Sequence, residues 1–217
     1  TGVQTCALPI SKIPKIIHMT CKDKRNMSKF YKTNYDSWRK YHPDWEINLY
    51  DDYDLYNELE DTPFKRFSES YDKIIYKVDI FKMHLLSKYG GVYVDMDVEC
   101  LKPLDPLLDK SHQLIFGYGP YEHNNGPYKD MKLVECAVMM SVPDHKFWDE
   151  FVMPNLKKSN ECKGHAVECT GPVFITNMIK KFQNKYGNNG QNGELKIMEP
   201  IYFYPINNQT KSRKIGR

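Results

Sequence analysis

Two hydrophobic periodicities alternate along this chain. In short segments apolar residues recur at every second position, as in β-strands, and in longer segments at every third or fourth, as in α-helices. Strands are predicted over residues 13–19, 45–49, 92–98, 114–116, 135–141 and 195–204, and helices over residues 28–41, 71–89, 144–157 and 172–186. Strands that alternate with helices indicate an α/β fold with a mostly parallel central sheet flanked by helices.

The helix predicted at 71–89 is followed directly by a strand with an unusual polar side. Gly90 and Gly91 separate the two, and such glycines are typical of helix C-caps. The strand alternates valines and a methionine with Tyr93, Asp95 and Asp97. On a strand the two aspartates would point the same way, about 6.6 Å apart. Paired carboxylates repel unless they share a proton or a cation, so this pair predicts a divalent ion, Mg²⁺ or Mn²⁺.

Two charged residues on the preceding helix belong to the same predicted site. Asp79 and Lys82 are three positions apart and therefore share a helix face. The glycine pair turns that helix back against the strand, so we expect Asp79, Lys82, Tyr93, Asp95 and Asp97 to converge. The aspartates come at the carboxyl end of the strand, where open α/β sheets bind ligands. Taken alone, Asp79 and Lys82 would be a common surface pair, and Asp-x-Asp is a weak pattern.

Composition sets outer bounds on the function. The chain has 217 residues, enough for one domain with a sizeable core. Its formal net charge of +3 is too small to favour nucleic acid as a partner. No run of about 18 apolar residues occurs, so no transmembrane segment is predicted. Tyrosine is frequent, at 16 residues, which we assign mostly to the core.

The cysteines argue against a zinc site, because no Cys-x-x-Cys pair is present. Most are expected to be buried thiols of a reducing compartment, which favours the cytoplasm. Cys162 and Cys169 could pair across a loop, and this leaves a lumenal compartment open.

Both ends of the chain look foreign. Residues 1–10, TGVQTCALPI, and residues 215–217, IGR, resemble translated sequencing-adapter DNA, and such scars are excluded from fold reasoning. We therefore expect a metagenomic fragment in which residues 11–214 form a single domain, while 1–10 and 215–217 are artefactual.

Several motifs taken together resemble one family. They are IPKIIH at 13–18, VDIFK at 78–82, LLSKYGGVYVDMDVE at 85–99, LKPLD at 101–105, TGP at 170–172 and FYP at 203–205. The chain resembles the DXD-containing glycosyltransferases, which include fungal initiating α-1,6-mannosyltransferases, bacterial capsular-polysaccharide transferases and the catalytic core of clostridial glucosylating toxins. The block from 78 to 105 is the specific part of this resemblance.

The resemblance implies a GT-A fold, a nucleotide-sugar donor (GDP-mannose or a UDP-hexose), Mn²⁺ or Mg²⁺, and retention of anomeric configuration. It implies that Asp97 binds the metal directly and that Asp95 contacts the ribose or sugar and reaches the metal. Tyr93 would pack on the nucleotide, and Asp79 would hold hydroxyls of the donor sugar. Asp79, Asp95 and Asp97 are thus the expected catalytic residues.

Lys82 and His18 complete the expected donor-binding set. Lys82 would act as a point charge on phosphate or pair with Asp79. His18 ends the first predicted strand near the expected donor pocket, with a structural role as its alternative.

The chain departs from the family pattern in three places. Lys82 stands where the family usually has arginine, so the planar, bidentate fork is lost. Cys21 stands where the family usually has a tryptophan that stacks on the donor base. The family's C-terminal His/Trp/Ser segment has no counterpart after residues 203–205. We therefore expect a domain that is incomplete at its C-terminus and has little or no activity.

These observations favour a transferase that moves a hexose (mannose, glucose or galactose) to a glycan, lipid or protein acceptor. We expect it to be cytoplasmic, with or without membrane association, or in the Golgi lumen if an N-terminal anchor has been lost. A non-catalytic nucleotide-sugar-binding module is one alternative. A metal-dependent phosphodiesterase is another, but it would need further acidic and histidine ligands and a basic groove.

Overall fold

The computed structural model describes residues 12–108, 111–120, 128 and 130–205. The segments predicted to be artefactual, 1–10 and 215–217, lie outside the described residues.

The described residues build a six-stranded mixed sheet, with strand order β2-β1-β3-β5-β4-β6. β2, β1 and β3 are parallel to one another, β4 and β6 are parallel, and β5 runs antiparallel to both of its neighbours. The predicted mostly parallel sheet is confirmed, with β5 as its exception. The strands are β1 (Ile16–Thr20), β2 (Glu46–Tyr50), β3 (Gly91–Asp95), β4 (Leu114–Tyr118), β5 (Val134–Ser141) and β6 (Leu195–Met198).

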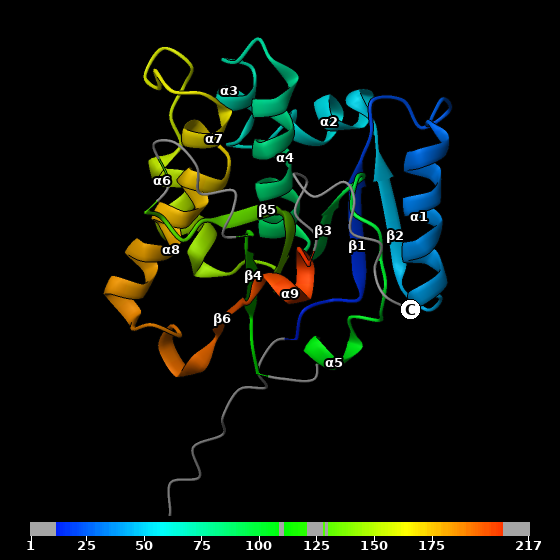
Figure 1. The fold of residues 1–217 in the computed structure, drawn as a ribbon. Coiled ribbons are helices and arrows are strands. Elements are labelled where there is room, and N and C mark those ends of the chain that lie inside the picture. Colours follow the sequence, from blue (N-terminus) through cyan, green and yellow to red (C-terminus); the bar gives the residue numbers. More distant parts are fainter. Residues whose placement is uncertain (1–11, 109–110, 121–127, 129, 206–217) are drawn as a thin grey trace, which may run out of the picture.

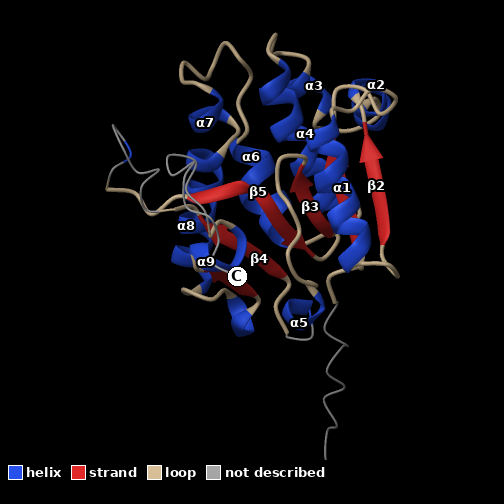
Figure 2. Ribbon diagram, turned by 45° about the vertical axis from the view of Figure 1, so that its right-hand side comes forward, coloured by secondary structure: helices blue, strands red, loops and turns tan. Residues whose placement is uncertain are grey.

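Helices cover both faces of this sheet, as Figures 1 and 2 show. The first face packs against α2, α3, α4, α7 and α8, and the second against α1, α5 and α9. The α-helices are α1 (Lys29–Tyr41), α2 (Asp52–Leu59), α3 (Lys65–Ser68), α4 (Ile74–Lys88), α5 (Asp105–Leu108), α6 (Met153–Asn155), α7 (Ala166–Cys169), α8 (Pro172–Tyr186) and α9 (Pro200–Phe203). The predicted α/β class, with helices on both faces, is confirmed.

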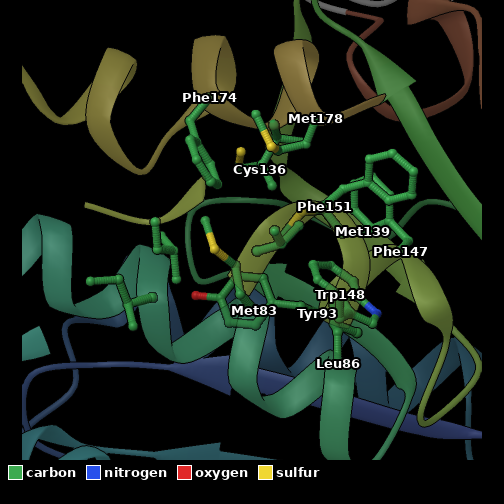
Figure 3. Packing of buried hydrophobic residues seen from close by; sticks show 14 of the residues in the cluster. Met83, Leu86, Tyr93, Cys136, Met139, Phe147, Trp148, Phe151, Phe174 and Met178 are labelled. Atoms are coloured by element: carbon green, nitrogen blue, oxygen red, sulfur yellow. The ribbon is translucent and has the colours of Figure 1, made fainter. Parts of the chain in front are cut away.

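The larger of the two cores lies between α4, α8 and the centre of the sheet (Figure 3). Tyr93, Phe147 and Trp148 are fully buried there, and Met83 of α4 is 1% exposed. Fully burying a side chain of this size stabilises a fold by about 1.5–3 kcal/mol. The first face of β3 is therefore dry, which determines the electrostatics of Asp79 and Lys82 on α4.

The turn between α4 and β3 depends on its two glycines. Gly90 and Gly91 have φ values of 63° and 88°, a region that side chains rarely adopt. A Cβ on Gly90 would lie 2.6 Å from the Pro143 nitrogen, and one on Gly91 would lie 2.6 Å from the Ile16 carbonyl oxygen. The predicted C-cap is confirmed, and this close approach lets α4 fold straight back onto β3.

Three predicted elements differ from the structure at their ends. The strand predicted to 98 ends at Asp95. The strand predicted over 195–204 is only β6, because Pro200 occupies the first turn of α9. The helix predicted from Asp144 contains a π-helical turn over Trp148–Val152. At the start of this helix, Nδ1 of His145 accepts a hydrogen bond from the Phe147 amide at 3.1 Å.

The described cysteines include one disulfide-bonded pair and three free thiols. Cys162 and Cys169 form a disulfide. Cys100 and Cys136 are buried free thiols, and Cys21 is half-buried.

Candidate active site

Lys82 is the centre of the predicted cluster. Its Nζ lies 3.1 Å from Asp79 Oδ1 and 3.1 Å from Asp95 Oδ1, which joins α4 to the carboxyl end of β3. The same ammonium lies 5.0 Å from the centre of the Tyr93 ring. Of the five residues expected to converge, these four lie together around the Lys82 ammonium. The alternative of a solvated surface pair is wrong, because Lys82 is 4% and Asp79 is 5% exposed.

Asp79 has a second partner from a distant part of the chain. Thr170 directly follows α7, and its Oγ1 lies 3.0 Å from Asp79 Oδ2. Thr170 is fully buried. One oxygen of the Asp79 carboxylate therefore meets an ammonium and the other a hydroxyl, so both are satisfied inside the protein.

Burial and charge act against each other on this pair. Burial alone would lower the pKa of the Lys82 ammonium, but the charges of Asp79 and Asp95 outweigh it and raise that pKa well above its ordinary value. Burial raises the pKa of Asp79, and Lys82 and Thr170 oppose that rise. Because Lys82 keeps its proton, Asp79 always faces a positive charge, and the cluster stays polar in a dry environment.

Tyr93 packs against the Lys82 ammonium of this cluster. Its ring is fully buried, and its hydroxyl lies 2.7 Å from Oγ1 of Thr20, the last residue of β1. Burial raises the pKa of the phenol well above its ordinary value, with the charge of Asp95 as the next cause. In this structure the ring supports Lys82 and offers no exposed face to a nucleotide.

The two DXD aspartates lie on a turn, which corrects the expected strand geometry. The Val98 amide donates to the Asp95 carbonyl oxygen at 3.1 Å, so Met96 and Asp97 form the middle of a four-residue turn. Alternation to opposite faces therefore ends at Asp95, and the spacing expected for a strand does not apply.

Helix α1 holds this turn in place. Asn34 Nδ2 donates to the Met96 carbonyl oxygen at 2.9 Å, and Trp38 Nε1 donates to the Val98 carbonyl oxygen at 2.9 Å. Ser37 Oγ accepts from the Cys100 amide at 2.8 Å. These three residues lie on one face of α1, at spacings of three and four. They replace the sheet ladder that the segment after β3 lacks.

Asp95 and Asp97 are the open part of the site. The side chain of Asp95 is 32% exposed, and Asp97 is exposed. Although the residue is exposed, nearby protein atoms partly desolvate its carboxylate, and this desolvation, followed by repulsion from Asp95, raises the pKa of Asp97. A carboxylate that is repelled by its neighbour is stabilised when a cation joins the two.

The charges of the cluster suit one divalent cation. When all four groups are ionised, Asp79, Asp95 and Asp97 with Lys82 leave two uncompensated negative charges, and they are concentrated at the exposed turn. Within the described ranges no group of three or more His, Cys, Asp or Glu side chains is placed to hold a metal ion. Two carboxylates leave most of an octahedral shell to other oxygen donors, and Mg²⁺ is commonly held this way when substrate phosphates supply the rest.

His18 does not join the cluster. It is 1% exposed, and its Nε2 donates to the Gly90 carbonyl oxygen at 2.9 Å, which leaves Nδ1 to accept from Tyr50 Oη at 3.2 Å. Burial lowers its pKa. The structure gives His18 the structural role that the sequence left open, because it connects β1 with β2 and with the turn after α4.

Sequence reasoning missed Thr170 and Asn34 as members of the site. For Asn34 a signal was present, since a polar residue shares the α1 face of a buried tryptophan, and a buried amide needs a partner. For Thr170 the only signal was the TGP motif, which says nothing about contact with Asp79.

Comparisons with known proteins agree with this geometry. Residues 28–114 match the family described as "Glycosyltransferase sugar-binding region containing DXD motif". Mannosyl phosphorylinositol ceramide synthase CSH1 of Saccharomyces cerevisiae is 30% identical, over 92% of this chain and 51% of the relative. Inositol phosphoceramide mannosyltransferase 1 of Schizosaccharomyces pombe is 33% identical, over 80% of this chain and 53% of the relative. The chain thus spans about half the length of these curated relatives.

One solved structure supports the fold. The PaToxG glycosyltransferase superposes with a TM-score of 0.52 at 16% identity, over 80% of this chain and 70% of that chain. The chain has the GT-A fold, and its residues 28–114 are similar to the glycosyltransferase sugar-binding region that contains the DXD motif.

Proposed function

We propose that this protein is a retaining, metal-dependent glycosyltransferase that moves a hexose from a nucleotide-diphosphate sugar to an acceptor. The observation that carries the proposal is the buried Asp79–Lys82 pair, joined to Asp95 beside the exposed Asp97. The cluster lies at the carboxyl end of β3, the edge where open α/β sheets bind ligands.

The open turn is the proposed metal and diphosphate end of the site. Asp97 and Asp95 would hold Mn²⁺ or Mg²⁺, and Asp95 would also contact the ribose or sugar. Such an ion neutralises negative charge that develops on a leaving diphosphate. Lys82 donates to one oxygen of Asp95 at 3.1 Å, so the second oxygen is the one left for the donor or the ion.

The buried end is the proposed donor-sugar end. Asp79 would accept hydrogen bonds from hydroxyls of the donor hexose, as the family resemblance implies. Both of its oxygens already have a partner, and a carboxylate oxygen has lone pairs for a second one. Lys82 is enclosed by carboxylates, so its proposed role is to orient them and not to contact phosphate.

Retention needs either a nucleophile on the protein or attack from the leaving-group side. Asp79, the carboxylate at the sugar end, is bound by Lys82 and Thr170, which weakens it as a nucleophile. We therefore favour front-face displacement, in which the departing phosphate takes the proton of the acceptor hydroxyl. Trapping a glycosyl group covalently on Asp79 or another carboxylate would contradict this step.

The names of the relatives favour particular substrates. They transfer mannose, and their acceptors are inositol-containing ceramide lipids. From these names we propose GDP-mannose as the first donor to test, ahead of UDP-glucose and UDP-galactose, and a lipid as the first acceptor class, ahead of glycans and proteins. In the described part of the chain no helix is long and apolar enough to cross a membrane.

The test is a panel of sugar-nucleotide donors with and without Mn²⁺. For each donor, calorimetry measures binding, and the release of free sugar measures hydrolysis. The proposal expects metal-dependent binding of one sugar nucleotide and its slow hydrolysis by a version of the protein as long as its relatives. Binding without turnover in that longer version would support a non-catalytic module. Cleavage of phosphodiesters without any sugar transfer would support a phosphodiesterase.

A further inference from the structure

The residue that donates to Asp79 Oδ2 directly follows a small, covalently closed loop. The disulfide between Cys162 and Cys169 closes this loop, and Thr170 is the next residue. Oγ1 of Thr170 lies 3.0 Å from Asp79 Oδ2 and 3.3 Å from the carbonyl oxygen of Ala166, which is inside the loop. The hydroxyl therefore lies between the loop backbone and the carboxylate.

The loop is tied to α4 at a second point. Tyr76 lies on α4, about one turn before Asp79. Its Oη donates to the carbonyl oxygen of Gly164 in the loop at 3.4 Å. The amides of Thr170 and Gly171 both donate to the Ala166 carbonyl oxygen, at 3.0 and 2.7 Å, and α8 begins directly afterwards. Thr170 is thus held between the disulfide on one side and the first turn of α8 on the other.

The segment that leads to this hydroxyl is short and partly exposed. α7 has four residues, too few to be stable as an isolated helix, and the outer part of its loop is exposed. Closing the loop covalently removes conformations in which Thr170 lies away from α4. Cys169 is 3% exposed and packs on the larger core, so the cross-link is anchored at the Thr170 end.

We propose that Thr170 is a positioning residue that aims Asp79 at the donor sugar, and that the Cys162–Cys169 disulfide keeps Thr170 in place. This inference rests on the proposed function, because it assigns Asp79 to the sugar and not to the nucleotide. It requires the disulfide-bonded form for full donor selectivity, and therefore an oxidising compartment.

The first experiment compares a sugar nucleotide with the bare nucleoside diphosphate. If Thr170 acts through Asp79, Thr170→Val weakens binding of GDP-mannose (or whichever donor binds) in Mn²⁺ about tenfold, the low end for a hydrogen bond to a charged group. Binding of GDP in Mn²⁺ stays the same, because the diphosphate end is untouched. Thr170→Ser keeps the hydroxyl and restores donor affinity.

Thr176→Val is the matched control. Thr176 is 2% exposed, its Oγ1 accepts from the Val134 amide at 2.9 Å and donates to the Pro172 carbonyl oxygen at 2.7 Å, and it does not contact Asp79. This variant loses stability, as Thr170→Val does, but the ratio of the two affinities stays at the wild-type value. A purely structural Thr170 would behave like this control.

The second experiment tests the disulfide. A dithiol reductant gives two electrons to the Cys162–Cys169 bond, which becomes two thiols, while the reductant becomes its cyclic disulfide. Reduction should weaken sugar-nucleotide binding about threefold through the freed loop, with GDP binding unchanged. The Cys162→Ser/Cys169→Ser double variant should show the weaker value from the start and no response to the dithiol.

The outcomes separate this inference from the proposed function. If wild-type protein binds no sugar nucleotide in Mn²⁺, both fail. If it binds one, but Thr170→Val keeps the wild-type affinity ratio or weakens donor and GDP equally, the positioning role fails and the proposed function stands. If reduction leaves the ratio unchanged, the role of the disulfide is wrong.

Discussion

The site has two halves that differ in how they are built. On α4, Asp79 and Lys82 are almost fully buried, and every charged atom there meets a partner of the protein itself. On the turn after β3, Asp97 is exposed, and its charge is opposed by that of Asp95. The first half is complete without a ligand, whereas the second is electrostatically incomplete.

This difference indicates which kind of ligand each half of the site suits. A buried ion pair contributes little net stability, but it fixes the direction of its members. Two carboxylates that repel each other on an exposed turn lower the stability of the folded protein, and a bound cation removes this repulsion. The buried half therefore suits recognition of a defined group such as a sugar, and the open half suits a metal ion and a diphosphate that arrive together.

The largest expected effect comes from removing the cation of the buried half. Lys82→Met keeps the length of the side chain but leaves Asp79 buried and uncompensated. We expect the free energy of unfolding to fall by about 3–5 kcal/mol, as when one partner of a buried pair is lost. Urea denaturation at pH 7 measures it.

Lys180→Met is the control, because it makes the same substitution at a lysine that is exposed on α8. It should alter stability by less than about 0.5 kcal/mol. If Lys82→Met costs no more than this control, the buried half is not held by its ion pair, and the contrast between the halves disappears.

The next effect is a loss of donor binding without a loss of stability. Asp97→Asn removes one of the two carboxylates of the open half, so Mn²⁺-dependent donor binding should weaken about 100-fold, at the upper end of the range for damaged metal sites. Calorimetric titration of the donor in Mn²⁺ measures this change. Without metal the variant should be at least as stable as wild type, since it removes the repulsion from Asp95.

Glu99→Gln is the matched control, because it neutralises another exposed carboxylate two residues further along the chain. It should leave Mn²⁺-dependent binding within about twofold of wild type, since it only changes the long-range field. Equal losses in Asp97→Asn and Glu99→Gln would mean that general charge, and not a metal site, draws the donor.

The buried half was the more predictable one. α4 and β3 have strong periodicities, and the glycine pair between them leaves one way to fold back. The convergence of Lys82 with Asp79 and Asp95 follows from these local rules. α2 was missed because it has only eight residues and two buried positions, although Asp51 and Asp54 form its capping box.

The open half was harder to predict because burial keeps alternating after the strand has ended. Met96 is buried and Val98 half-buried, so the pattern of β3 continues through a turn. That turn is held by side chains of α1, about 60 residues earlier, and such long-range hydrogen bonds leave no periodic signal. Thr170 is further still from Asp79, 91 positions along the chain, and only the folded chain brings the two together.

The smallest expected effect concerns the support of the buried half and depends on pH. His18 holds the turn between α4 and β3, and burial lowers its pKa below that of the unfolded chain. The unfolded state therefore binds a proton first as pH falls below about 6.5, so stability decreases from there until the folded pKa is reached. His18→Gln, which can still donate to the Gly90 carbonyl oxygen, should reduce this slope by up to about 1.4 kcal/mol per pH unit. Urea denaturation between pH 5 and 8 measures it.

His165→Gln, on an exposed histidine, should leave the slope unchanged. If both variants have the wild-type slope, His18 does not couple protonation to folding, and the buried half does not depend on the tie beneath it.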